Sequence, residues 1–192
     1  MFPTTLQTPR LDFQRLCRDT VSVEEYYSLV GRVNPTAEAE MQYIPREPVA
    51  SMGAAADRLA DFEARWDARD RAEYALFSRE TGRLVGTAGL LCRWEQSVAL
   101  PAVRLRKAVW GRGYAGERAD ALLELAFERL DFDCVSIPVH ADNEQSRRAV
   151  ARYVDRHGGR YEGCFRHDAA REDGPVDRHR FSITSDEYED AK

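Results

Sequence analysis

Three glycines, Gly111, Gly113 and Gly116, lie close together just before a helix-like segment at residues 118–130 and just after a strand-like run at residues 102–105. Glycine permits positive φ angles and close approach of a ligand to the backbone. The first N–H groups of a helix have no partner within it, and the helix dipole places partial positive charge there. A strand, a glycine loop and a helix start therefore predict an anion site, for which a pyrophosphate is the natural ligand.

The spacing of these glycines also matches the dinucleotide fingerprint G-x-G-x-x-G. That fingerprint normally occupies the first βα turn of a doubly wound domain, whereas this loop lies past the midpoint of the chain. A ribose-binding acid is expected at the end of the next strand, but Asp131 precedes that strand and Asp142 follows it. A Rossmann-type dinucleotide-binding protein is therefore the less favoured alternative, and an ordinary tight turn is another.

Hydrophobic periodicity predicts the elements that position this loop, in the order β-α-α-β-β-β-α-β-α-β-β. The expected strands cover residues 11–16, 73–78, 83–94, 98–109, 134–140, 160–167 and 176–184, and the expected helices 22–30, 51–66, 118–130 and 143–157. The turn at residues 80–82 favours an antiparallel hairpin, and strand-helix-strand around the glycine loop favours a parallel crossover. We expect one α/β domain over residues 1–192, with a mixed, largely antiparallel central sheet flanked by helices.

The composition excludes several classes of protein. The chain has 192 residues, 43% hydrophobic and 32% charged, with a net charge of −5, which argues against a nucleic-acid partner. Its four cysteines are far apart and form no C-x-x-C pair, so no metal site is expected. The first ten residues lack the signal-peptide pattern, and the longest near-apolar run, residues 84–92, is too short to span a bilayer. The sequence predicts a cytoplasmic protein with no membrane partner.

The glycine loop and its surroundings resemble a known family. Residues 110–117, Trp-Gly-Arg-Gly-Tyr-Ala-x-Glu, resemble the coenzyme A loop of the GCN5-related N-acetyltransferases, in the branch that acetylates the N-terminal alanine of a ribosomal protein. The predicted order of elements is also that of the family. Three later segments resemble the same branch: Asn143-x-x-Ser146, the turn at residues 158–163, and Asp177 followed by residues 181–183 and 187–188.

Two positions depart from the family pattern. Leu100 stands where many relatives have a glutamate, and Arg106-Lys107 replaces an acidic residue and a proline. The incoming strand is therefore more basic than in relatives, and the usual general-base position is empty.

The resemblance implies transfer of an acetyl group from acetyl-coenzyme A to a primary amine. It implies that backbone N–H groups of residues 112–116 hold the pyrophosphate and that a free N–H in strand residues 105–109 stabilises the oxyanion. Arg112 either adds a charge-assisted contact or is a solvated surface residue. The coenzyme-binding residues implied are Val109, Gly111, Arg112, Gly113, Tyr114, Ala115, Gly116 and Asn143.

The candidates for proton transfer lie mainly in the second half of the chain. Relatives protonate the leaving thiolate with a tyrosine or serine of the penultimate helix; Val150 occupies the tyrosine position, so Ser146 is the first candidate and Tyr153 the second.

Candidate bases are Glu95, His140 and Asp142. His140 ends a parallel strand beside Asn143, and an imidazole titrates near pH ~6.5. An α-amine has a pKa of about 7.7–8.0, so part of it is already neutral at pH 7 and such an acceptor needs only a water path.

The expected acceptor is a protein or peptide N-terminus. A small-molecule amine and a non-catalytic acyl-coenzyme A sensor are the alternatives. The expected partners are acetyl-coenzyme A and the acceptor, with the protein acting as a monomer or a homodimer.

Overall fold

The computed structural model describes residues 1–44, 47–171 and 174–192. Its centre is an eight-stranded sheet in the order β1-β2-β3-β4-β5-β6-β8-β7. The strands are β1 Thr5–Gln7, β2 Leu11–Arg15, β3 Arg71–Ser78, β4 Leu84–Arg93, β5 Val98–Leu105, β6 Cys134–His140, β7 Arg160–Arg171 and β8 Gly174–Thr184. Only β5 and β6 are parallel; every other neighbouring pair is antiparallel. The predicted mixed, largely antiparallel sheet is therefore confirmed.

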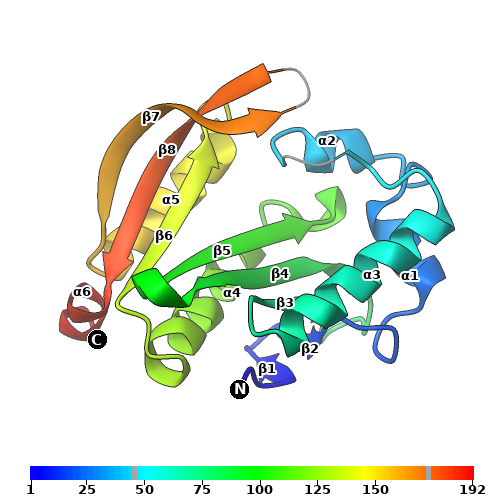
Figure 1. The fold of residues 1–192 in the computed structure, drawn as a ribbon, viewed down its shortest axis with the longest axis horizontal. Coiled ribbons are helices and arrows are strands. Elements are labelled where there is room, and N and C mark those ends of the chain that lie inside the picture. The colour runs from blue at the N-terminus through cyan, green and yellow to red at the C-terminus, as the bar shows by residue number, and fades with distance from the viewer. Residues whose placement is uncertain (45–46, 172–173) are drawn as a thin grey trace.

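Helices cover both faces of this sheet (Figure 1). They are α1 Val23–Val30, α2 Ala37–Met41, α3 Met52–Asp67, α4 Tyr114–Glu124, α5 Glu144–Arg156 and α6 Ser185–Asp190. Strand β3 shows the two layers, because Ala75 packs with the buried residues of α1 and α3, whereas Tyr74 and Leu76 pack with those of α4 and α5. We call the side covered by α1 and α3 the front face and the side covered by α4 and α5 the rear face.

The helix starts follow the sequence closely. The hydroxyl oxygens of Ser22 and Ser51 accept hydrogen bonds from backbone N–H groups one turn further on, and Asn143 caps α5 in the same way. Each cap satisfies an N–H that would otherwise have no partner at the helix start. These three helices begin within one residue of the predicted starts at residues 22, 51 and 143.

Five segments differ from expectation. A three-residue strand, β1, precedes the first expected strand; it is too short to show periodicity. Helix α2 lies in a stretch expected to be irregular, and α6 follows the last expected strand. The strand expected over residues 98–109 ends at Leu105, because residues Lys107–Val109 form a 3₁₀ turn. Helix α4 begins earlier than expected, at Tyr114, and continues as a π-helical turn over Leu125–Arg129.

The sheet divides between its two parallel strands. Strands β5 and β6 pair only through Val98 with Cys134 and Ala99 with Val135. Beyond those pairs the strands separate, which Figure 1 shows as β6, β8 and β7 diverging from β5. We call this unpaired stretch the β5–β6 split; its paired end lies at Ala99, and its open end lies at the C-terminal ends of both strands. Within the described part of the chain, no helix is long and apolar enough to cross a membrane.

Candidate active site

The glycine loop joins the open end of β5 to α4. Gly111 and Gly113 have φ angles of 74° and 81°, the left-handed region that favours glycine, and Gly113 is the N-cap of α4. A side chain added at Gly111 or Gly116 would meet no atom within 4 Å. The loop therefore presents its backbone to open space on the side where a ligand would approach.

The backbone donors of this loop are largely unused. Among the described residues, the N–H groups of Arg112 to Ala115 donate no hydrogen bond, while the N–H of Gly116 lies 3.2 Å from the Gly113 carbonyl oxygen. Unpartnered N–H groups at a helix start, together with the helix dipole, attract an anion. This geometry suits the pyrophosphate that the sequence predicts. The Gly116 N–H already donates to the Gly113 carbonyl and so is not free to bind the ligand.

Thr8 and Arg10 of the N-terminal segment bind Glu117 and Arg112 and hold the glycine loop in place; we call these contacts the latch. Both the Thr8 hydroxyl and the Arg10 backbone N–H donate to Glu117, at 2.6 and 2.7 Å, and the Arg10 Nε donates to the same carboxylate at 2.6 Å. The Arg10 Nη1 donates to the Arg112 carbonyl at 2.7 Å, and its guanidinium lies 4.9 Å from the centre of the Tyr114 ring. Partial burial disfavours ionisation of Glu117, but the hydrogen bonds from Thr8 and Arg10 outweigh it and lower the pKa of this carboxyl.

Arg104 and Arg106, at the end of β5, bind helix α1. Arg104 donates to the Leu29 carbonyl, and Arg106 Nη1 to the Ser28 carbonyl at 3.3 Å, so both guanidinium groups bind the C-terminal end of α1. Cations are favourable there because the helix dipole places negative charge at that end. Of the residues that depart from the family pattern, Arg106 thus contacts α1.

Glu40 of α2 completes this buried cluster. Its carboxylate lies 3.1 Å from Arg104 Nη2 and accepts the Lys107 backbone N–H at 2.8 Å. Burial lowers the pKa of Arg104, and Glu40 opposes that shift. Because Glu40 binds both β5 and the 3₁₀ turn, it fixes α2 against the strand that leads into the glycine loop. No local signal in the sequence marked Glu40, whose partners come from distant segments.

Few backbone donors remain free at the end of β5. The N–H groups of Arg106, Lys107 and Val109 are all used, by the Val85 carbonyl, by Glu40 and by the Arg106 carbonyl. Antiparallel pairs alternate between facing the partner strand and facing away. Since Arg106 faces β4, the N–H groups of Val103 and Leu105 point into the split. Within residues 105–109, the N–H groups of Leu105 and Ala108 donate no hydrogen bond to any described residue.

Two other residues of this edge fit the same alternation. Pro101 belongs to the set that faces away from β4, where its missing N–H removes no ladder bond. The carbonyl of Leu105 accepts the Trp110 indole N–H at 2.9 Å, so Trp110 shields the last acceptor of the strand.

Helix α5 carries two hydroxyl groups in contrasting surroundings. Ser146 is half-buried in the first turn of α5, where its backbone N–H donates to Asn143 Oδ1 at 3.0 Å; within the described residues its hydroxyl has no hydrogen-bond partner. Tyr153 is only 3% exposed and lies beside the buried Arg118 on the rear face. Burial raises the pKa of the Tyr153 hydroxyl, and the neighbouring Arg118 guanidinium opposes that shift.

The candidate bases lie at opposite ends of the split. His140 ends β6 at the open end, where its ring centre lies 5.1 Å from that of Tyr43 and its Nδ1 accepts the Asp142 backbone N–H at 3.2 Å. Asp142 itself is exposed. Glu95 lies in the exposed 3₁₀ turn Trp94–Gln96 between β4 and β5, at the paired end. The structure thus brings His140 and the start of α5 to the same edge as the glycine loop, and leaves Glu95 at the other.

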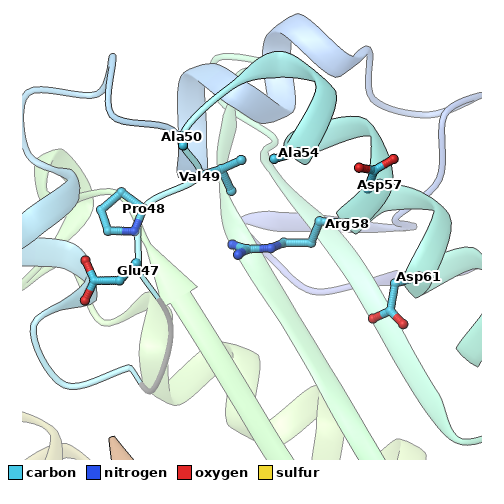
Figure 2. A pocket seen from close by; sticks show the side chains of 8 residues that line it. All are labelled: Glu47, Pro48, Val49, Ala50, Ala54, Asp57, Arg58 and Asp61. Carbon is cyan, nitrogen blue, oxygen red and sulfur yellow. The ribbon is translucent and has the colours of Figure 1, made fainter. Parts of the chain in front are cut away.

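Other features of the described residues lie outside this arrangement. No group of three or more His, Cys, Asp or Glu side chains within them is placed to hold a metal ion. A shallow depression of about 530 Å³ lies over α3 and the segment before it, where Arg58 reaches across the hollow between acidic residues (Figure 2). It contains no residue of the glycine loop or of the split.

The overall fold of this chain resembles that of solved acetyltransferases. A GCN5-related N-acetyltransferase from Brucella melitensis aligns at 18% identity over 98% of this chain and 82% of its own, with a TM-score of 0.81. A candidate ribosomal-protein-serine acetyltransferase from Vibrio cholerae aligns at 20% identity over 96% and 99%, with a TM-score of 0.76. The microcin C7 self-immunity acetyltransferase MccE, crystallised with acetyl-CoA and AMP, aligns at 13% identity over 95% and 97%, with a TM-score of 0.82.

These likenesses define the fold class as that of the N-acetyltransferases. The sequence also matches the family model of the acetyltransferase (GNAT) domain over residues 12–153, so the chain belongs to that family. No curated protein sequence matches the chain.

Proposed function

We propose that this protein transfers an acetyl group from acetyl-coenzyme A to a primary amine, with a protein or peptide N-terminus as the acceptor. The observation that carries the proposal is the set of unpartnered N–H groups at the glycine-capped start of α4, beside the β5–β6 split. Family membership supports acetyl transfer, and one neighbour of the same fold was crystallised with acetyl-CoA. The likeness of residues 110–117 to the N-terminal-acetylating branch, and the Vibrio cholerae neighbour, favour a protein N-terminus.

Binding of the coenzyme would use backbone groups on both sides of the loop. The N–H groups of Arg112 to Ala115 suit the pyrophosphate, and the guanidinium groups of Arg10 and Arg112 add positive charge near it. The N–H groups of Val103 and Leu105 suit the amides of the pantetheine arm, which would then lie along β5 like an added strand. Asn143 is held at the start of α5 by its capping bond and faces the same edge.

The remaining chemistry needs three groups. A free N–H of β5, at Val103 or Leu105, would stabilise the negative charge that develops on the thioester oxygen. The Ser146 hydroxyl would give its proton to the departing thiolate, and His140 would take the proton that the amine loses, directly or through water. Leu100 provides no carboxylate on this strand, which makes His140 the better placed of the candidate bases.

Thermal denaturation tests the coenzyme assignment. Coenzyme A should raise the melting temperature, and NAD and ATP should not, because a ligand that binds only the folded state stabilises it by an amount set by its concentration relative to Kd. At about one hundred times Kd the stabilisation is roughly 2.7 kcal/mol. Protection by NAD without coenzyme A would instead restore the dinucleotide-binding alternative.

Turnover then separates the remaining alternatives. Acetyl-coenzyme A consumption should be measured against a panel of peptides with free N-termini and a panel of small amines. Turnover confined to peptides supports the proposal, turnover confined to small amines supports the small-molecule alternative, and coenzyme binding with no turnover supports the sensor.

A further inference from the structure

No helix of the described residues covers the front face of β6, β8 and β7 (Figure 1). Val135, Ile137 and Val139 of β6 belong to the rear core, so the intervening residues face the front. In the register of β6 with β8, His140 lies opposite Arg178 and Pro138 lies opposite Arg180. Both arginines therefore project from the front face, as His140 does, on β8, the strand next to β6.

These arginines share a single carboxylate. Arg178 Nε donates to Asp168 Oδ2 at 2.7 Å and its Nη2 to the Asp168 carbonyl at 2.8 Å, while Arg180 Nη2 donates to Asp168 Oδ1 at 2.7 Å. We call Arg178 and Arg180 the arginine pair. Among the described residues, two guanidinium groups against one carboxylate leave one uncompensated positive charge, and both side chains remain in contact with solvent, at 28% and 35% exposure.

Within the described residues, the arginine pair also has N–H groups that donate no hydrogen bond. A guanidinium has five N–H donors, and within the described residues neither Nη1 of the arginine pair donates a hydrogen bond. Asp168 and the Phe165 ring, 4.5 Å from the Arg180 guanidinium, hold the side chains in place before a ligand arrives. Glu162 is another described carboxylate on this front face. It accepts the Ser182 hydroxyl and forms no ion pair with either arginine.

The arginine pair also lies close to the open end of the split, because Arg178 is paired with His140, the last residue of β6. The segment after α2 meets this half of the molecule twice: the Tyr43 ring lies against His140, and the Gln42 carbonyl accepts from Arg171 Nη1 at 2.7 Å. The arginine pair therefore lies on the half-sheet that this segment contacts, and on the same face as His140.

We infer that the arginine pair binds an anionic group of the acceptor, so that the preferred substrates are amines with a carboxylate or phosphate close by, such as peptides whose second and third residues are acidic. The inference rests on the proposed function for the identity of the amine. Arginine suits this ligand because its planar fork matches the geometry of a carboxylate or a phosphate.

Peptide binding to the coenzyme A-loaded protein tests the inference without requiring turnover. Peptides that begin Ala-Glu-Glu, Ala-Gln-Gln and Ala-Lys-Lys, labelled at the C-terminus, would be compared by fluorescence anisotropy. The acidic peptide should bind about tenfold more tightly than the neutral one at low salt, with the preference shrinking as salt screens the charges. Competition by free glutamate and O-phosphoserine would show whether a small molecule with the same anionic group also occupies this surface.

Three variants assign the preference to the arginine pair. R178Q and R180Q should each remove most of it, while D168N, which deletes the shared carboxylate, should increase it. R58Q is the matched control, since it removes the same charge from the front layer at the depression of Figure 2. Melting temperature and coenzyme A affinity report whether each variant is folded.

Equal affinity for the acidic and neutral peptides, or a preference lost in R58Q and kept in R180Q, would overturn the inference. Failure of the proposed function has a different signature, because it appears as absence of acetylation of every acceptor whatever the binding preference.

Discussion

Ser146 and Tyr153 lie on one helix, but the structure gives their hydroxyls opposite surroundings. Ser146 is in the first turn of α5, half-buried and near the edge that carries the glycine loop. Tyr153 faces the rear core at the paired end of the split, where it lines a small cavity with Pro101, Arg118 and Val135. A proton donor must reach the departing sulfur, and only Ser146 lies on the side from which the coenzyme would enter.

This contrast predicts two different kinetic results. Ser146→Ala should lower kcat by roughly 10²–10⁴ with little change in coenzyme A affinity, because the hydroxyl acts only as the sulfur becomes charged. Tyr153→Phe should keep near-normal turnover but lose about 1–3 kcal/mol of stability, because the buried Arg118 guanidinium loses the nearby hydroxyl oxygen that favours its charge. Steady-state kinetics and thermal denaturation of both variants provide the measurement.

The opposite pattern would reassign the acid. If Ser146→Ala kept full turnover while Tyr153→Phe lost it, Tyr153 would be the proton donor despite its burial. A loss of stability without a loss of turnover in Ser146→Ala would leave Ser146 with a role in the fold of α5 only.

At the scale of elements, the glycine loop is a turn whose conformation is set by two glycines and a latch. Gly113→Val should abolish coenzyme A binding in a protein that still folds, since a β-branched residue is strained at a φ of 81° and its Cβ would lie 3.3 Å from Arg10 Nη2, which would disturb the contact that holds the loop. The strain costs about 1–3 kcal/mol, which a domain of this size tolerates. Isothermal titration of coenzyme A is the measurement.

Gly116→Ala provides the matched control for that variant. Gly116 lies in the first turn of α4 without a positive φ, and an added methyl group would meet nothing within 4 Å. The alanine variant should therefore keep both its melting temperature and its coenzyme affinity. Unchanged affinity in Gly113→Val would show that the loop is a turn and not a binding site.

The sequence predicted those parts of the fold that depend on local patterns. The capping residues Ser22, Ser51 and Asn143 mark helix starts because a side-chain oxygen must satisfy a nearby N–H, and this requirement is local. The glycine loop was recognisable for a similar reason, because positive φ favours glycine. Alternation of apolar residues then located most strands of the sheet.

Features that depend on distant partners were not predictable. Helix α2 is short, and its position follows from the ion pair of Glu40 with Arg104, two residues far apart in the sequence. The latch joins Arg10 to Glu117, and the arginine pair faces the split only because β8 pairs with β6 in one register. The split itself depends on where the pairing of β5 with β6 stops. The sequence of either strand alone does not predict that position.

At the scale of the whole molecule, the β5–β6 split divides the sheet into two half-sheets, β1 to β5 on one side and β6, β8 and β7 on the other. The two halves of the molecule are connected at both ends of the split. At the paired end they are joined by two residue pairs, Val98 with Cys134 and Ala99 with Val135. At the open end the segment after α2 contacts His140 and Arg171. Between these ends one edge of β5 retains backbone groups without a strand partner, so a ligand that supplies amide groups can complete the ladder.

This arrangement predicts a residue-specific change in amide hydrogen exchange. The N–H groups of Val103 and Leu105 point into the split, whereas those of Ala102 and Arg104 already face β4. Saturating coenzyme A should slow exchange at Val103 and Leu105 by roughly tenfold or more, equivalent to about 1.4 kcal/mol of added protection, and should change the other two little. Amide exchange followed by NMR resolves these neighbouring residues. Exchange that stays equally fast at Val103 and Leu105 when the coenzyme is bound would show that its pantetheine arm does not pair with β5, and the donors to the thioester oxygen would then have to be sought elsewhere.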